Sequence, residues 1–184
     1  FNFLFIIYIQ LMSCSSYSNN ADVNNIDTVN TIDINNIYKI ALLVPVTSKS
    51  LPIDTPLEDT YLFTNLLNSI YDTLDENEIK QYIITLYLGY DANDPIYDAI
   101  GSSKRLKNAI KSKLPYIQLK LIRMIGASQR IGYIWNYLTI RAYHGSNHYY
   151  IILSDDAILK SNNWISKIVE PLQLNRDIGV VSFY

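Results

Sequence analysis

Residues 149–156 read Tyr-Tyr-Ile-Ile-Leu-Ser-Asp-Asp, an apolar run that ends directly in two adjacent carboxylates. An apolar stretch of this length is typical of a buried strand. Two ionised side chains at its tip are costly to desolvate, so they need a cation or a strong partner. Mg²⁺ and Mn²⁺ suit hard carboxylate oxygens, and both ions in turn suit phosphate. A solvated turn or a helix N-cap after the strand is the alternative interpretation.

A second apolar run, residues 39–46, reads Lys-Ile-Ala-Leu-Leu-Val-Pro-Val. Its lack of polar alternation indicates burial on both faces, as in a parallel sheet. Pro45 cannot donate to a ladder, so we expect the strand to end there. Further strands are predicted at 81–88, 116–124, 149–153 and from 178, and helices at 57–74, 97–112, 128–143 and 161–174. This alternation predicts an α/β domain with a mainly parallel sheet and helices on both faces.

The composition excludes several classes of protein. The chain has 184 residues, of which 49% are hydrophobic, so it can bury the core of one domain. Its formal net charge is -2, with no basic excess, and we therefore expect no nucleic-acid partner. One cysteine, Cys14, rules out an internal disulfide, and with two histidines it forms no zinc framework. The chain also lacks the glycine-rich phosphate loops and the nucleophile elbow of nucleotide triphosphatases, dehydrogenases and hydrolases.

The chain divides by composition into three parts. Residues 1–12 are nearly all apolar but too short for a bilayer, which needs about 20 residues. We expect a targeting or anchor remnant there, hence a secretory or membrane-associated location and membrane association through the N-terminus. A buried segment and a cytoplasmic location are the alternatives. Residues 13–37 predict a polar flexible stem, and residues 38–184 the folded domain. Because the chain opens on Phe and stops inside an apolar run, we expect a piece of a longer protein, truncated at its C-terminus.

Polar residues follow three of the predicted strands. Thr47 follows the first, Asp91 and Asp94 the second, and Asp155 and Asp156 the fourth. The carboxyl ends of parallel strands share one edge, where open α/β sheets bind ligands. Acidic groups repel phosphate unless a metal ion intervenes, and a diphosphate bridged by Mn²⁺ or Mg²⁺ resolves that conflict. Asp156, with Asp155 acting through a water, is predicted to hold the ion, and Asp91 to accept hydrogen bonds from a ribose or a base.

These segments resemble the nucleotide-sugar glycosyltransferases of the GT-A fold. Residues 40–47 resemble their opening strand, and residues 126–136 are similar to the helix before their metal motif. Residues 149–156 resemble the strand that ends in the Asp-x-Asp motif, and residues 163–181 the segment after it. The resemblance spans residues 39–184 and is closest to the family 2-like branch. The pattern departs in one place, because Ser154 occupies the first acidic position.

The resemblance implies the donor-binding half of a Rossmann-like glycosyltransferase. Such an enzyme transfers a sugar from a nucleoside diphosphate sugar to a hydroxyl of a glycan, protein or lipid acceptor. By this resemblance Asp156 is the direct metal ligand. The residues expected to contact the nucleotide sugar are Val46, Thr47, Asp91, Asp94, Arg130, Asn136 and Asp155. A base that deprotonates the acceptor lies in the later half of such enzymes, so none is assigned here.

Two other functions stay open. A sugar-nucleotide nucleotidyltransferase usually has a glycine-rich basic loop after its first strand, and residues 47–50, Thr-Ser-Lys-Ser, lack glycine. The other alternative is a non-catalytic binding module, in which Ser154 marks the loss of the metal site. Trp135 and Trp164 are interpreted as core residues. The cluster of Lys and Arg at 104–113 is interpreted as a solvated helix face.

Overall fold

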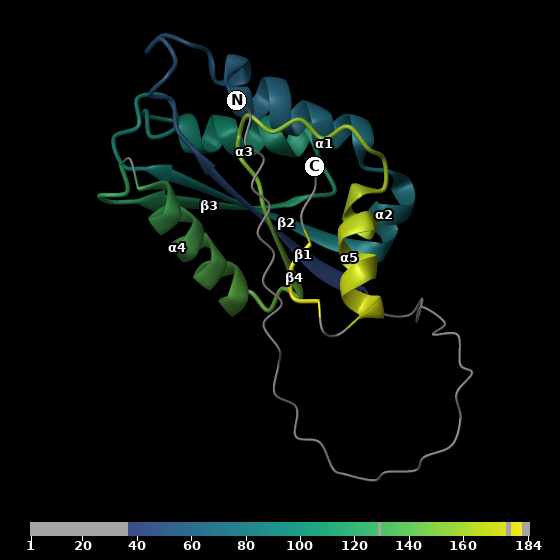
Figure 1. The fold of residues 1–184 in the computed structure, drawn as a ribbon. Coiled ribbons are helices and arrows are strands. Elements are labelled where there is room, and N and C mark those ends of the chain that lie inside the picture. Colours follow the sequence, from purple (N-terminus) through teal and green to yellow (C-terminus); the bar gives the residue numbers. More distant parts are fainter. Residues whose placement is uncertain (1–36, 129, 176–177, 182–184) are drawn as a thin grey trace, which may run out of the picture.

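The computed structural model describes residues 37–128, 130–175 and 178–181. The predicted targeting remnant at 1–12 and the predicted stem up to residue 36 lie outside the described residues. The described elements, shown in Figure 1, are β1 (Tyr38–Val46), η1 (Leu57–Asp59), η2 (Leu62–Leu67), α1 (Asn68–Thr73), α2 (Glu76–Gln81), β2 (Tyr82–Asp91), α3 (Ser102–Lys113), β3 (Gln118–Met124), α4 (Ile131–His144), β4 (Tyr149–Ile152) and α5 (Trp164–Leu174).

The sheet has four strands in the order β3-β2-β1-β4, and every pair is parallel. Leu42 in the middle of β1 pairs with Leu86 of β2 and with Ile151 of β4. The predicted α/β class with a parallel sheet is therefore confirmed for the described residues. The apolar runs that predicted it belong to β1, which lies between β2 and β4, and to β4, which pairs only with β1 in the described sheet. Both strands send side chains into the hydrophobic clusters on the two faces of the sheet.

The two faces of the sheet carry separate hydrophobic clusters. Ile40, Leu42 and Val44 of β1 point into the larger cluster, which α1, α3 and α5 complete. Ala41 and Leu43 point the other way, into a smaller cluster that α4 completes. This alternation follows from the period of two along a strand. Figure 1 shows α4 on the opposite side of the sheet from α1 and α3, so helices cover both faces, as predicted.

Pro45 lies inside β1, which continues to Val46 and so outruns the expected end. The carbonyl of Leu43 accepts a hydrogen bond from Leu153, so odd-numbered residues of β1 direct their backbone groups toward β4. Pairing with β4 ends at Leu43 and Ile152. The missing N–H of Pro45 therefore faces a side where no strand follows, and the ladder with β2 is undisturbed.

Several predicted boundaries differ from the structure. The helix predicted at 57–74 is divided into η1, η2 and α1, and the Thr60 hydroxyl bonds to the Leu57 carbonyl at the first break. The helix predicted from residue 97 begins at Ser102, because turns occupy the preceding segment. Helix α2, which Asp75 caps through two backbone N–H groups, was not predicted. Residues 178–181 are irregular, not a strand, and residues 182–184 lie outside the described part.

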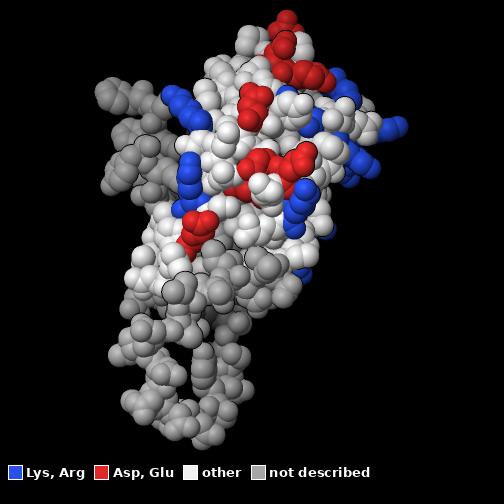
Figure 2. Space-filling view, turned by 90° about the vertical axis from the view of Figure 1, so that its right-hand side faces the viewer, with Lys and Arg blue, Asp and Glu red and all other residues white. Residues whose placement is uncertain are grey.

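The surface carries mixed charge on the side that Figure 2 presents. Acidic side chains form several separate groups there, with basic side chains around them. Within the part of the chain that the structure describes, no helix combines the length and the apolar composition needed to cross a membrane.

Candidate functional site

A cleft of about 290 Å³ opens at the carboxyl edge of the sheet. From β1 the chain continues outward to β2 and β3, whereas β4 lies on the other side of β1. The strand order thus reverses between β1 and β4, which is where open α/β sheets place their ligands. The cleft wall is formed by the end of β1 and the loop after it, the last residue of β2, the loops after β3 and β4, and the first turns of α4. The predicted convergence of the strand ends on one edge is confirmed.

Val46, Thr47, Asp91, Arg130 and Asp155 all line this cleft. These are five of the seven residues expected to contact a nucleotide sugar. They come from the ends of β1, β2 and β4 and from the N-cap of α4. Parallel pairing explains the convergence, because each of these strands ends on the same side of the molecule.

Asp155 is the half-buried carboxylate of the cleft. Burial raises its pKa from the ordinary 3.8 to about 6, and the neighbouring charge of Asp156 adds to the rise. The backbone amide of Thr47 hydrogen-bonds to the carboxylate and opposes the shift in part. The protein groups around Asp155 therefore do not compensate its negative charge fully.

Asp156 has a different position from its neighbour. It is exposed and does not line the cleft, although the sequence predicted it as the direct metal ligand. Its Oδ1 accepts a hydrogen bond from the Ser154 hydroxyl, and its backbone carbonyl accepts one from Asn65 at 3.3 Å. Ser154, which occupies the first acidic position of the motif, thus binds the side chain two residues later and also lines the cleft.

Asp91 ends β2 on the opposite wall. The backbone N–H of Ala127 donates to its Oδ1 at 3.2 Å, which ties the end of β2 to the loop after β3. Gly126, with a φ of 70°, makes the turn that presents this N–H. Asp91 is therefore a positioned carboxylate with one oxygen engaged by the backbone.

Two cations lie at the cleft, and sequence reasoning named only one of them. Arg130 is the N-cap of α4, with no side-chain cap on the helix, and Lys49 follows β1. The Lys49 ammonium donates to the hydroxyl of Ser128, so the loops after β1 and β3 meet across the cleft. Lys49 could be recognised from sequence only by its place, three residues past a buried strand.

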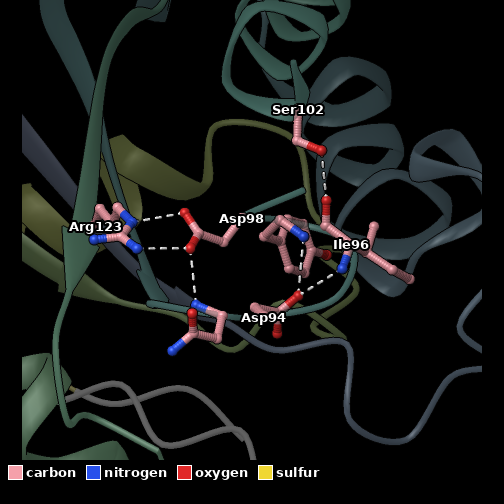
Figure 3. A network of polar contacts seen from close by, with 7 residues as sticks. Asp94, Ile96, Asp98, Ser102 and Arg123 are labelled. Carbon is pink, nitrogen blue, oxygen red and sulfur yellow. Dashed lines mark hydrogen bonds and ion pairs between the residues drawn. The ribbon is translucent and has the colours of Figure 1, made fainter. Parts of the chain in front are cut away.

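Asp94 does not line the cleft and has a structural role instead. It is only 4% exposed. Its carboxylate accepts hydrogen bonds from the Ser48 hydroxyl at 2.6 Å, the Ser48 N–H at 2.9 Å, and the N–H groups of Ile96 and Tyr97. Figure 3 shows this carboxylate turned into its own loop. With its oxygens engaged and buried, Asp94 has little capacity to meet a ligand.

Asp98 anchors the same loop to the edge of the sheet. Arg123 of β3 donates two hydrogen bonds to it, at 2.7 and 2.9 Å, and the Asn93 N–H donates a third (Figure 3). The bond from Arg123 holds the pKa of Asp98 below its usual range. This bidentate pair keeps the loop after β2 in place beside the cleft.

Asn136 is exposed on α4 and does not line the cleft, contrary to the expectation from the resemblance. The cleft is lined by Ile131, Ile134 and Trp135 of α4, whereas the exposed Asn136 follows Trp135 by one residue and so lies about 100° further round the helix. Trp135 is half-buried, packs against the smaller hydrophobic cluster and also lines the cleft. Trp164 is a buried core residue, as predicted.

The cleft offers a small set of oxygen atoms to a cation. Asp155 supplies a carboxylate whose charge is under-compensated, and Thr47 and Ser154 add hydroxyl oxygens nearby. Among the described residues, no group of three or more His, Cys, Asp or Glu is placed to hold a metal. Mg²⁺-type ions commonly use one or two carboxylates together with water and substrate phosphate, and this donor set matches that pattern.

Comparison with known proteins adds no family to this geometry: no family model, no curated protein and no solved structure matches the chain.

Proposed function

We propose that the cleft binds a nucleoside diphosphate sugar together with Mn²⁺ or Mg²⁺, and that the protein is a glycosyltransferase of the GT-A type. One observation carries this proposal. A cleft at the reversal of strand order combines two carboxylates, Asp91 and Asp155, with two cations, Lys49 and Arg130. A simple anion site would need no carboxylate, and a simple cation site would need no Lys or Arg.

The ligand's groups divide among these side chains by charge. Lys49 and Arg130 would bind the phosphate oxygens. The free N–H groups at the start of α4 would add positive potential, because no side chain caps that helix. Asp91 would accept hydrogen bonds from ribose hydroxyls, and Asp155 would hold the cation.

Sugar transfer forms a bond between the acceptor oxygen and the anomeric carbon, and it breaks the bond from that carbon to the diphosphate. The negative charge that develops on the leaving diphosphate is what the cleft would stabilise. A bound divalent ion would supply part of that stabilisation. Lys49 and Arg130, which both line the cleft, would supply the rest.

Titration calorimetry with UDP and GDP, each with and without Mn²⁺, tests the proposal. We expect nucleotide binding that requires Mn²⁺ and falls at least about tenfold in Asp155→Asn. Asp156→Asn should weaken binding less, because that side chain is exposed and bonded to Ser154. Asp72→Asn, an exposed carboxylate on α1, is the matched control and should bind normally.

The same titrations separate the alternatives. Tighter binding of UTP or GTP than of the diphosphates would favour a sugar-nucleotide nucleotidyltransferase. No binding of any nucleotide, with either metal, would overturn the proposal and leave a non-catalytic module. Release of UDP or GDP from UDP- or GDP-sugars, lost in Asp155→Asn, would establish turnover.

A further inference from the structure

The small net charge of the chain conceals a strong separation of charge along the sequence. Nine of the 15 Lys and Arg residues lie between residues 99 and 154, and none of the 17 Asp and Glu residues does. This segment contains α3, β3, α4 and β4. The positive charge is therefore concentrated in one contiguous part of the fold.

The sheet divides this segment between its two faces. β3 is one of the two edge strands of the described sheet, α3 packs on one face, and α4 packs on the other. On the face that carries α4, several large apolar side chains of this one helix are exposed together.

The outer stripe of α4 is apolar and uncovered in the described structure. Tyr133, Tyr137, Ile140 and Tyr143 are 50, 36, 54 and 53% exposed. Tyr133, Tyr137 and Arg141 follow each other at intervals of four, so they share one side of the helix. The rings of Tyr133 and Tyr137 lie 6.4 Å apart. We call Tyr133, Tyr137, Ile140, Arg141 and Tyr143 the α4 surface.

Two further cations lie on the α4 side of the sheet or at the start of the helix. Lys120 of β3 is exposed, and it alternates with Leu119 and Leu121, which pack against the cluster on the other face. Lys120 therefore points to the same side of the sheet as α4. Arg130 lies at the start of the helix. Helix α4 itself contains no carboxylate.

We propose that the α4 surface docks onto an anionic lipid bilayer, with Lys120 and Arg141 contacting lipid phosphates and the Tyr and Ile side chains entering the interface. Tyrosine is favoured at the membrane–water interface because its ring is apolar and its hydroxyl is polar. Peripheral helices that bind membranes combine such a face with Lys and Arg. Docking does not require the proposed sugar transfer.

The apolar residues favour a membrane over a nucleic acid. Ile140, which is 54% exposed, offers nothing to a phosphate backbone or a base edge. It gains free energy on leaving water for the acyl chain boundary. The acid-free helix adds attraction to an anionic surface, a charge complementarity that a neutral bilayer lacks.

Co-sedimentation of the full chain with vesicles tests the docking. Vesicles of phosphatidylcholine alone are compared with vesicles that also contain phosphatidylserine, at low and high salt. We expect binding to the anionic vesicles that weakens with salt. The double variant Lys120→Gln/Arg141→Gln should bind the anionic vesicles at least about tenfold more weakly. Its control, Lys107→Gln/Lys111→Gln on α3, changes the net charge equally and should bind as the parent does.

A second pair of variants tests the apolar contribution. Tyr137→Ser/Ile140→Ser should reduce binding at least about fivefold, whereas Ile53→Ser/Tyr61→Ser, which removes the same residue types elsewhere, should not. Thermal unfolding followed by circular dichroism verifies that each variant is folded. Equal losses in the charge variant and its α3 control, or vesicle binding unchanged by both α4 variants, would overturn the proposal. So would binding of a single-stranded oligonucleotide by a protein that does not bind the anionic vesicles.

Discussion

Replacing Asp155 by Asn should stabilise the metal-free protein at neutral pH and not at acid pH. In the folded state the carboxyl is half-buried beside Asp156, and its pKa is raised to about 6. In the unfolded chain it returns to about 3.8. The folded state therefore binds the proton more tightly, so stability falls as pH rises from about 4 to about 6 and stays low above that. Because Asn cannot ionise, the variant does not lose stability over this pH range.

The size of the effect follows from the shift. Each pKa unit corresponds to about 1.4 kcal/mol, so a rise of about two units costs the wild type about 3 kcal/mol at pH 8. The pKa of about 6 already reflects the hydrogen bond from the Thr47 amide, which favours the carboxylate over a neutral side chain. The expected net stabilisation is therefore up to about 3 kcal/mol at pH 8 and about zero at pH 4.

Urea unfolding of both proteins in EDTA, at pH 4.5, 6 and 8, measures the difference. Asp156→Asn is the matched control and should show a smaller gain, since it removes only the secondary cause of the shift. A difference between Asp155→Asn and wild type that does not change with pH would refute this reasoning. With Mn²⁺ and UDP present the order should reverse at pH 8, because only the wild type gains from ligand binding.

Three further changes probe the parts that hold the cleft. A Cβ built on Gly89 would lie 3.0 Å from the side chain of Leu138, so Gly89→Ala should push α4 off the sheet and cost about 1–3 kcal/mol in urea unfolding; an unchanged midpoint would contradict that packing. Ser48→Ala removes a hydroxyl that donates to the buried carboxylate of Asp94 and should cost about 1.5–3 kcal/mol, whereas Ser48→Thr should recover part of that loss. Burial lowers the pKa of His148, whose Nδ1 accepts a backbone N–H of β1, so the contribution of His148 to stability should fall as pH drops below about 6.5. The wild type should therefore lose stability relative to His148→Gln between pH 7 and pH 5.

The sequence was sufficient to predict the strands and the edge where polar groups meet. The unbroken apolar runs of β1 and β4 indicated burial on both faces, which in turn implied parallel pairing. Parallel pairing then brought Thr47, Asp91 and Asp155 to one edge without knowledge of the register. The local pattern is informative here because the polarity of a strand's own side chains indicates which of its faces are buried.

Other features of the site depend on contacts between distant segments. Asp155 and Asp156 are chemically alike, and only the packing of the loop after β4 decides which one lines the cleft. Asp94 looked like a ligand-binding residue because it follows a strand, yet Ser48, 46 residues earlier, engages it. The hydrophobic periodicity of a sequence does not predict contacts between such distant residues.

The chain's residues determined an α/β domain with an acidic, hydroxyl-bearing strand edge, because burial and pairing follow from apolar periods read over a few residues. Tertiary structure alone decided that Lys49 meets Ser128 across 79 residues, that Asn136 points outward, and that Lys120 lies on the same side of the sheet as the exposed tyrosines of α4. Those relations depend on how helices and loops are oriented on the sheet. Orientation is set by the sum of many long-range contacts, which no short stretch of sequence contains.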